Sequence, residues 1–277
     1  MVVSVPAVGA YVLCHNNART VRQAVESVAR QTLPIDEIVV VDDASDDHPD
    51  EELRGLGVRV VRHDRNLGRG AARARAMEEV RHDYVLCCDA SKRLELTFVE
   101  RALPWFNDER VAAVVGRITQ PPARGVVDRW RGRHLLKLDT AQPLRHRAAL
   151  VTAGALIRAS AVGAVGGYDP RLRHTEDADL GVRLLEAGYD IVGDPDLHVE
   201  CISSNTLGEV LERYWRWYAG ANEEAHVGAY WKTIGYSIKS MAVADLRAGD
   251  PRGVPISLLC PHYQFWRSWQ RRRRRRY

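Results

Sequence analysis

Short apolar runs alternate with amphipathic stretches along the first 120 residues of the chain. Five of these runs are short enough for buried strands: residues 8–14, 37–41, 58–61, 84–88 and 111–115. Between them, Val21, Ala24, Val25 and Val28 follow helical spacing, residues 49–55 suit a short helix, and residues 68–80 are rich in alanine. Strands that alternate with helices predict an α/β fold, with a mostly parallel central sheet and helices on both faces.

The pattern loosens after residue 117. A strand over 149–157, a helix over 178–187 and an amphipathic helix around Leu207–Tyr218 are still expected. Helical, aromatic-rich segments and an arginine run follow, which predicts a main domain over residues 1–220 and a helical extension over 221–277. The arginine-rich stretch 117–147 is either a solvated face or one lining of a cleft.

Acidic residues stand where the predicted strands end. Asp42 and Asp43 close one run, and Asp89 closes another. A single aspartate there can be a turn former, but ligands of such sheets bind at the carboxyl ends of the strands, and three acids converge. Glu176 and Asp177 begin a further helix, where a carboxylate can also serve as a cap. The pattern predicts a cleft that holds a phosphorylated ligand and activates an acceptor.

Composition describes an ordinary globular protein, because 45% of the 277 residues are hydrophobic and 27% are charged. The net charge of +4 comes from Arg271–Arg276, without which 34 basic residues face 36 acidic ones. The five cysteines form no Cys-x-x-Cys pair and are read as buried free thiols in a reducing compartment. Neither a signal pattern nor a run of about 18 apolar residues is present, so a cytoplasmic protein is expected.

Aromatic residues precede the arginine run: Tyr263, Phe265, Trp266 and Trp269. This combination predicts binding to an anionic membrane surface, which would place the protein peripherally at the inner face of a membrane. The alternatives are a solubilising tail or one that adheres to nucleic acid without specificity; no specific nucleic acid partner is expected.

Several motifs, in order and at fitting spacing over residues 8–220, resemble the family 2 glycosyltransferases, which are inverting nucleotide-sugar enzymes with the GT-A fold. The matching segments are Val12–Asn16, Ala24–Val28 with Gln31–Thr32, Glu37–Asp47, Asn66-x-Gly68 with Ala72–Arg73, Glu176–Asp177, and Arg213-x-x-Arg216-Trp217. The last of these resembles a motif of processive members. Because the chain shows no membrane span, processive export by this chain alone is not expected.

The resemblance implies transfer of a sugar from a nucleotide-diphosphate donor to a hydroxyl group. A UDP-sugar is the first candidate donor, and GDP- and dTDP-sugars are the alternatives. The acceptor is a glycan, a lipid-linked sugar, a peptide or a small molecule. Asp177 is the implied general base, beside Glu176. The implied donor-binding residues are Asn16, Asp42, Asp43, Asn66, Gly68, Arg73 and Asp89. Those on the acceptor or diphosphate side are Lys92, Arg213, Arg216 and Trp217.

One departure concerns the metal site. The family's Asp-x-Asp element reads Asp89-Ala90-Ser91 here, so one expected carboxylate ligand for Mn²⁺ or Mg²⁺ is missing. Metal could bind through Asp89, the diphosphate and His198, unless His198 is an ordinary strand-edge residue. Alternatively, Lys92 or Arg93 supplies the positive charge. An altered metal dependence is expected in either case.

Two rival functions remain. A catalytically impaired member of the family could act as a sugar-nucleotide-binding or scaffold subunit; the broken Asp-x-Asp favours this reading and the intact Glu176–Asp177 opposes it. A nucleotidyltransferase on a similar α/β fold would carry a glycine-rich, basic phosphate loop near the first strand, and residues 13–20 do not supply one.

Overall fold

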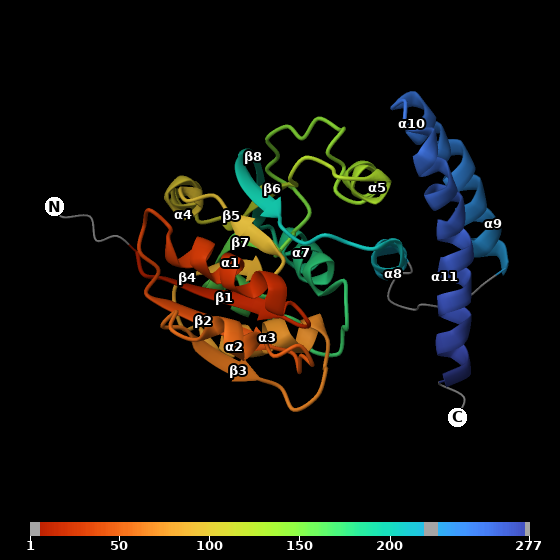
Figure 1. Cartoon of the computed structure of the whole chain (residues 1–277). Coiled ribbons are helices and arrows are strands. Elements are labelled where there is room, and N and C mark those ends of the chain that lie inside the picture. Colours follow the sequence, from red (N-terminus) through yellow and green to blue (C-terminus); the bar gives the residue numbers. More distant parts are fainter. Residues whose placement is uncertain (1–5, 219–226, 275–277) are drawn as a thin grey trace. The chain divides into compact units, whose positions relative to one another are not determined.

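The computed structural model describes residues 6–218 and 227–274 and divides the chain into two compact units (Figure 1). The first comprises Met1–Thr119 with Gln142–Ser203, and the second comprises Gln120–Ala141 with Ser204–Tyr277. The predicted boundary after residue 220 therefore falls inside the second unit. The division into a catalytic domain over 1–220 and an extension over 221–277 stays a prediction.

A single mixed sheet organises the described part of the first unit. Its eight strands lie in the order β3-β2-β1-β4-β7-β6-β8-β5. Neighbours β3, β2, β1 and β4 are parallel, β7 is antiparallel to β4 and β6, β6 and β8 are parallel, and β5 is antiparallel to β8. The strand bounds are β1 Val8–Cys14, β2 Glu37–Asp42, β3 Arg59–Arg62, β4 Tyr84–Asp89, β5 Lys92–Leu94, β6 Val111–Thr119, β7 Gly154–Arg158 and β8 Asp190–Cys201. The carboxyl ends of β1, β2 and β4 consequently share one edge.

Helices cover both faces of this sheet, as the sequence predicted. Successive residues of a strand point to opposite faces, so Val40 belongs to the core shared with α1 and α4, while Val39 and Val41 belong to the core shared with α3, α6 and α7. The helices of this unit are α1 Ala18–Ala29, α2 Pro49–Leu53, α3 Arg69–Glu79, α4 Phe98–Ala102, the 3₁₀ helix η1 Leu103–Asn107, α6 Ala159–Ala164 and α7 Glu176–Glu186. The α/β prediction is confirmed, with β7 and β5 supplying the antiparallel pairs.

Several elements were not predicted. β5 has only three residues, too few for a periodic pattern, and the expected strand over 149–157 begins at Gly154. β8 is long but contains Pro195 and several acidic residues, and its pairing with β6 shifts register between Gly116 and Arg117. Such an interruption breaks the alternation from which a strand is recognised.

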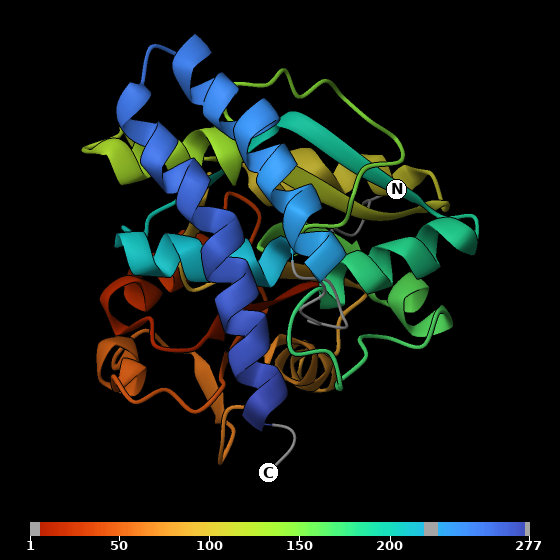
Figure 2. The same cartoon turned by 90° about the vertical axis from the view of Figure 1, so that its right-hand side faces the viewer.

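The second unit is helical in its described residues. It contains α5 Val126–His134, α8 Leu207–Tyr218, α9 Val227–Tyr236, the π-helix η2 Ser237–Ala242, α10 Val243–Arg247, the 3₁₀ helix η3 Pro251–Gly253 and α11 Val254–Arg274. Trp130 of α5 packs with Val210 and Tyr214 of α8 and with Cys260 of α11, and α9 and α11 run side by side (Figures 1 and 2). This shared core explains why α8 groups with the C-terminal helices.

The arginine-rich stretch 117–147 is only partly a solvated face. In the second unit, Arg129 pairs with Asp250, and Arg133 donates to the fully buried Asp245 at 2.7 Å. Ser257 also donates to Asp245, at 2.6 Å. These arginines therefore hold α5 against the segment around α10.

The sequence predicted buried free thiols and no membrane-spanning segment, and both predictions can be compared with the described residues. All five cysteines are free and buried. None of the helices seen in residues 6–218 and 227–274 combines the length and the apolar composition that crossing a bilayer requires.

Candidate functional site

The acidic end of β2 is occupied by contacts within the protein. Asp42 accepts hydrogen bonds from the backbone N–H and the hydroxyl of Ser45, at 3.0 and 2.5 Å, and pairs with Arg62. Asp43 accepts from the backbone N–H groups of Leu67 and Gly68, both at 2.8 Å. Both aspartates are buried. Their carboxylates thus hold the loops that follow β2 and β3.

Asn16 ties the end of β1 to the same region. Its backbone N–H donates to the Ser45 hydroxyl at 2.8 Å, and its side-chain oxygen accepts from the Asp46 N–H at 2.8 Å. The residue has a φ of 54°, which asparagine tolerates better than most residues. Asn16 therefore positions the loop after β2.

The Asn66-x-Gly68 segment packs directly on the chain that leads into α7. Asn66 accepts a hydrogen bond from Arg173 through its side-chain oxygen. Gly68 has a φ of 97°, and a Cβ there would lie 2.8 Å from the Arg173 Cα. Gly70 donates its N–H to the Leu172 carbonyl at 2.9 Å. The close approach that these glycines permit brings the starts of α3 and α7 together.

Arg73 joins two of the predicted acids, Asp89 and Glu176, into one cluster. Its guanidinium is 1% exposed and donates to Glu176 Oε1 at 2.8 Å and to Asp89 Oδ1 at 2.9 Å. It also donates to the Tyr11 hydroxyl at 3.0 Å and to the Thr152 carbonyl at 3.2 Å. A buried guanidinium that donates several N–H groups in this way holds its carboxylate partners in fixed positions. The strand end at Asp89 and the helix start at Glu176 therefore belong to one site.

Tyr11 and Thr152 are members of this cluster that were not predicted. Tyr11 could have been identified because it is a tyrosine within an apolar strand, and a buried tyrosine hydroxyl usually has a hydrogen-bond partner. Thr152 takes part through its backbone, for which the sequence carries no signal. Within the described residues the Thr152 hydroxyl and Glu176 Oε2 are buried without a hydrogen-bond partner, which leaves polar atoms for a ligand or water.

The two carboxylates that begin α7 have different surroundings. Glu176 is 1% exposed and is held by Arg73, whereas Asp177 is half-buried and accepts the N–H of Ala178 at 2.9 Å. Burial and the charge of Glu176 raise the pKa of Asp177, against the opposing charges of Arg73 and Arg69. A carboxylate with a raised pKa in a half-open position suits a general base.

Asp89 and Lys92 lie at the neighbouring strand end. Burial opposes ionisation of Asp89, but the charges of Arg73, Arg69 and Lys92 outweigh it and lower the pKa of Asp89. Lys92 is buried, with its Nζ 3.3 Å from the Cys201 sulfur. Arg93 is exposed and pairs with Glu200. Lys92 and Arg93 are the two residues predicted to supply a positive charge where the Asp-x-Asp element lacks its second carboxylate. Of these two side chains, that of Lys92 is directed into the protein.

The residues proposed to bind a metal do not form a set that fits a divalent cation. The Nδ1 of His198 lies 3.5 Å from Glu95, and the carbonyl of Ser91 accepts the N–H of Ile202. Ile202 thus marks the position that pairs with Ser91, and His198 lies four residues before it, about 13 Å away along the strand. Among the described residues no three His, Cys, Asp or Glu side chains gather as a metal site. The structure does not bring His198 to Asp89.

Arg213, Arg216 and Trp217 lie on α8, in the second unit. Tyr214 is buried in the core of that unit, and Trp215 is buried with its indole N–H donating to Ser268 of α11 at 3.1 Å, while Trp217 is 39% exposed. Tyr214 and Trp215 therefore serve the packing of this helix. The assignment of Arg213, Arg216 and Trp217 to the acceptor or diphosphate side stays a prediction.

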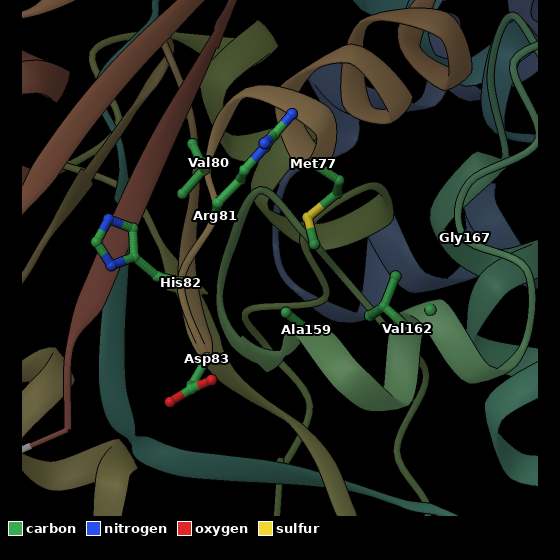
Figure 3. A pocket seen from close by; sticks show the side chains of 9 residues that line it. Met77, Val80, Arg81, His82, Asp83, Ala159, Val162 and Gly167 are labelled. Atoms are coloured by element: carbon green, nitrogen blue, oxygen red, sulfur yellow. The ribbon is translucent and has the colours of Figure 1, made fainter.

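A groove at the other end of β4 is distinct from this cluster (Figure 3). Met77, Val80 and His82 line it from the segment before β4, and Ala159 and Val162 line it from α6. β4 runs from Tyr84 to Asp89, so the groove and Asp89 are separated by about 17 Å along the strand. The acidic cluster, at the carboxyl ends of the parallel strands, has the position expected of a ligand site.

Comparison with known proteins agrees with this arrangement. The glycosyl transferase family 2 model matches residues 10–166. The chain is 30% identical over 191 residues to the pre-mycofactocin glycosyltransferase of Mycobacterium tuberculosis, covering 65% of this chain and 39% of that protein. It is 24% identical over 225 residues to the poly-β-1,6-N-acetyl-D-glucosamine synthase of Staphylococcus aureus, covering 76% and 53%. The chain thus spans well under two thirds of these relatives.

Solved structures share the fold. A mannosyltransferase from Pyrobaculum calidifontis, in complex with GDP-mannose and Mn²⁺, has a TM-score of 0.60 at 17% identity, covering 93% of this chain and 74% of that one. GalNAc-T7, with UDP, GalNAc and Mn²⁺, has a TM-score of 0.58 at 17% identity, covering 86% and 52%. The family model covers more than half of the chain, and its motifs lie on the GT-A architecture described above; the chain belongs to glycosyl transferase family 2.

Proposed function

We propose that the protein transfers a sugar from a nucleotide-diphosphate donor to an acceptor hydroxyl, with inversion at the anomeric carbon. The preferred candidate donor is a UDP-sugar, and Asp177 is the general base. The observation that carries this proposal is the unequal pair at the start of α7. Arg73 holds Glu176, while Asp177 remains half-buried with a raised pKa.

The proposed reaction assigns a role to each part of the cluster. Asp177 accepts the proton of the acceptor hydroxyl while its oxygen attacks the anomeric carbon. The bond from that carbon to the diphosphate oxygen breaks on the opposite face, and its electron pair leaves with the diphosphate. Glu176, Arg73 and Asp89 orient the base and the donor, and the loops held by Asn16, Asp42, Asp43, Asn66 and Gly68 shape the nucleotide pocket. Arg213, Arg216 and Trp217 serve the acceptor side.

A donor panel tests the function. The full chain is incubated with UDP-, GDP- and dTDP-sugars, with and without candidate glycan, lipid-linked, peptide and small-molecule acceptors, and release of the nucleoside diphosphate is measured. Acceptor-dependent release from one donor class is expected. Tight donor binding without turnover under any of these conditions would favour the alternative of a catalytically impaired, sugar-nucleotide-binding subunit.

Transfer is expected to slow as the pH falls, beginning above the range in which an ordinary aspartate titrates. Burial and the charge of Glu176 raise the pKa of Asp177. A general base acts in its ionised form, so activity is full above this pKa and declines below it. The measurement is kcat/KM against pH, with circular dichroism to confirm folding. A constant rate down to about pH 4, near the ordinary aspartate pKa of about 3.9, would contradict the assignment.

We further propose that α11 attaches the protein to anionic membrane surfaces. Trp266 and Trp269 are 47% and 40% exposed just before the arginine run, of which Arg275 and Arg276 lie outside the described residues. Interfacial aromatics and clustered basic residues favour anionic lipid. Full-length protein is expected to sediment with anionic vesicles and to release as salt rises, whereas a chain ending at Gln270 should bind less. Equal sedimentation of the two proteins would refute the proposal.

A further inference from the structure

Lys92 is a buried cation, 4% exposed, whose ammonium forms no ion pair with a carboxylate among the described residues. Its side chain and that of Leu94 are buried, while Arg93 between them is exposed. The ammonium contacts the Cys201 sulfur, 3.3 Å away. Within the part of the chain that the structure describes, no carboxylate lies in ion-pair distance of Lys92.

This arrangement leaves hydrogen-bonding capacity unused. An ammonium group carries three N–H donors, and a thiol is a weak acceptor. Burial of an ammonium group is unfavourable unless charge partners and hydrogen bonds compensate. A buried, under-partnered ammonium at the strand-end cluster is therefore suited to an anionic ligand.

The position of Lys92 identifies the class of ligand. It lies three residues after Asp89, whose carboxylate is held by Arg73 at the carboxyl edge of the sheet. The intervening Ser91 leaves no second carboxylate that would compete for the ammonium. Under the proposed function, the anion delivered to this edge is the diphosphate of the sugar donor.

We propose that the ammonium of Lys92 binds the donor diphosphate in place of a divalent cation, so that donor binding by this protein requires no metal. The inference rests on the proposed function and adds to it. As the bond to the sugar breaks, negative charge grows on the departing diphosphate. A fixed cation beside it stabilises that charge without any change in its own protonation. The poor fit of Asp89, Ser91 and His198 to a metal site is consistent with this exchange.

Calorimetric titration of UDP, GDP and dTDP into the full chain tests the proposal. The wild-type dissociation constant for the nucleotide that binds is expected to differ by less than about twofold between EDTA and excess Mn²⁺, because the metal adds no required contact. Lys92→Met keeps the length of the side chain and removes its charge. It should weaken binding in EDTA by about 10-fold to 100-fold, the scale of a charge-assisted hydrogen bond.

The matched control is Arg93→Met, one residue away on the exposed face of β5, which should bind the nucleotide like the wild type. A second readout needs no variant. The nucleotide's own phosphates bind Mn²⁺, so the reference is Mn²⁺ with nucleotide alone, and adding the protein should lower the electron paramagnetic resonance signal of free Mn²⁺ no further. This readout decides the question if Lys92→Met fails to fold, as judged by circular dichroism.

The outcomes separate the inference from the function on which it rests. Nucleotide binding that is lost in EDTA and restored by Mn²⁺ would overturn the role of Lys92 and leave the proposed function standing. Unchanged binding by Lys92→Met would do the same. If none of the three nucleotides binds with or without Mn²⁺, the proposed function falls as well.

Discussion

Replacement of Asp177 by asparagine is expected to slow sugar transfer by about 10²-fold to 10⁴-fold, the usual contribution of a general base. The amide keeps the shape of the carboxylate but cannot accept the acceptor's proton. Since the donor diphosphate lies on the other side of the anomeric carbon in the proposed reaction, donor affinity should not change. Nucleoside diphosphate release and calorimetry measure the two quantities separately.

Asp179→Asn is the matched control. It makes the same chemical change in the first turn of α7, at a residue that pairs with Arg183 on the same helix, 2.6 Å away. It should retain turnover close to that of the wild type, because an ion pair of this kind contributes little. Near-normal transfer by Asp177→Asn, or an equal loss in both variants, would remove Asp177 from the role of base.

Arg73→Met is expected to lower the free energy of unfolding by about 3–5 kcal/mol, the scale for breaking a buried ion pair from one side. The change leaves Glu176 and Asp89 without their shared cation in a site where Arg73 is 1% exposed. Urea unfolding followed by circular dichroism gives the value.

Arg75→Met serves as the control on the exposed side of the same helix. Arg75 pairs with Glu79 at 2.6 Å, one helical turn away, and a solvent-exposed pair of this kind contributes little to stability. If Arg73→Met cost no more than Arg75→Met, the cluster would not depend on Arg73 for its organisation.

The parallel half of the sheet could be predicted because β1, β2 and β4 are continuous apolar runs followed by polar residues. The mixed half could not. β8 pairs with β6 across a register shift, and β5 is three residues long, so neither leaves a regular period in the sequence. The second unit depends on Trp130 packing with α8 and α11, a contact between segments far apart in the chain.

For the candidate site, the strand ends and the helix start were easier to predict than the surroundings of each side chain. Asp42, Asp43, Asp89, Glu176 and Asp177 do lie at such positions, and their roles stay predictions. The backbone N–H groups of Leu67 and Gly68 donate to Asp43. These hydrogen bonds depend on the conformation of the loop, which the residue types alone do not predict. The inward direction of Lys92 and the outward direction of Arg93 likewise depend on the pleat of β5.

The most direct test of the account is a crystal structure of Asp177→Asn with a UDP-sugar, in which slow turnover preserves the donor. We expect the diphosphate beside Lys92, and the anomeric carbon facing residue 177 across a space that an acceptor hydroxyl can fill. A donor bound in the groove between Met77 and Val162 (Figure 3), or one whose anomeric carbon faces away from residue 177, would contradict it.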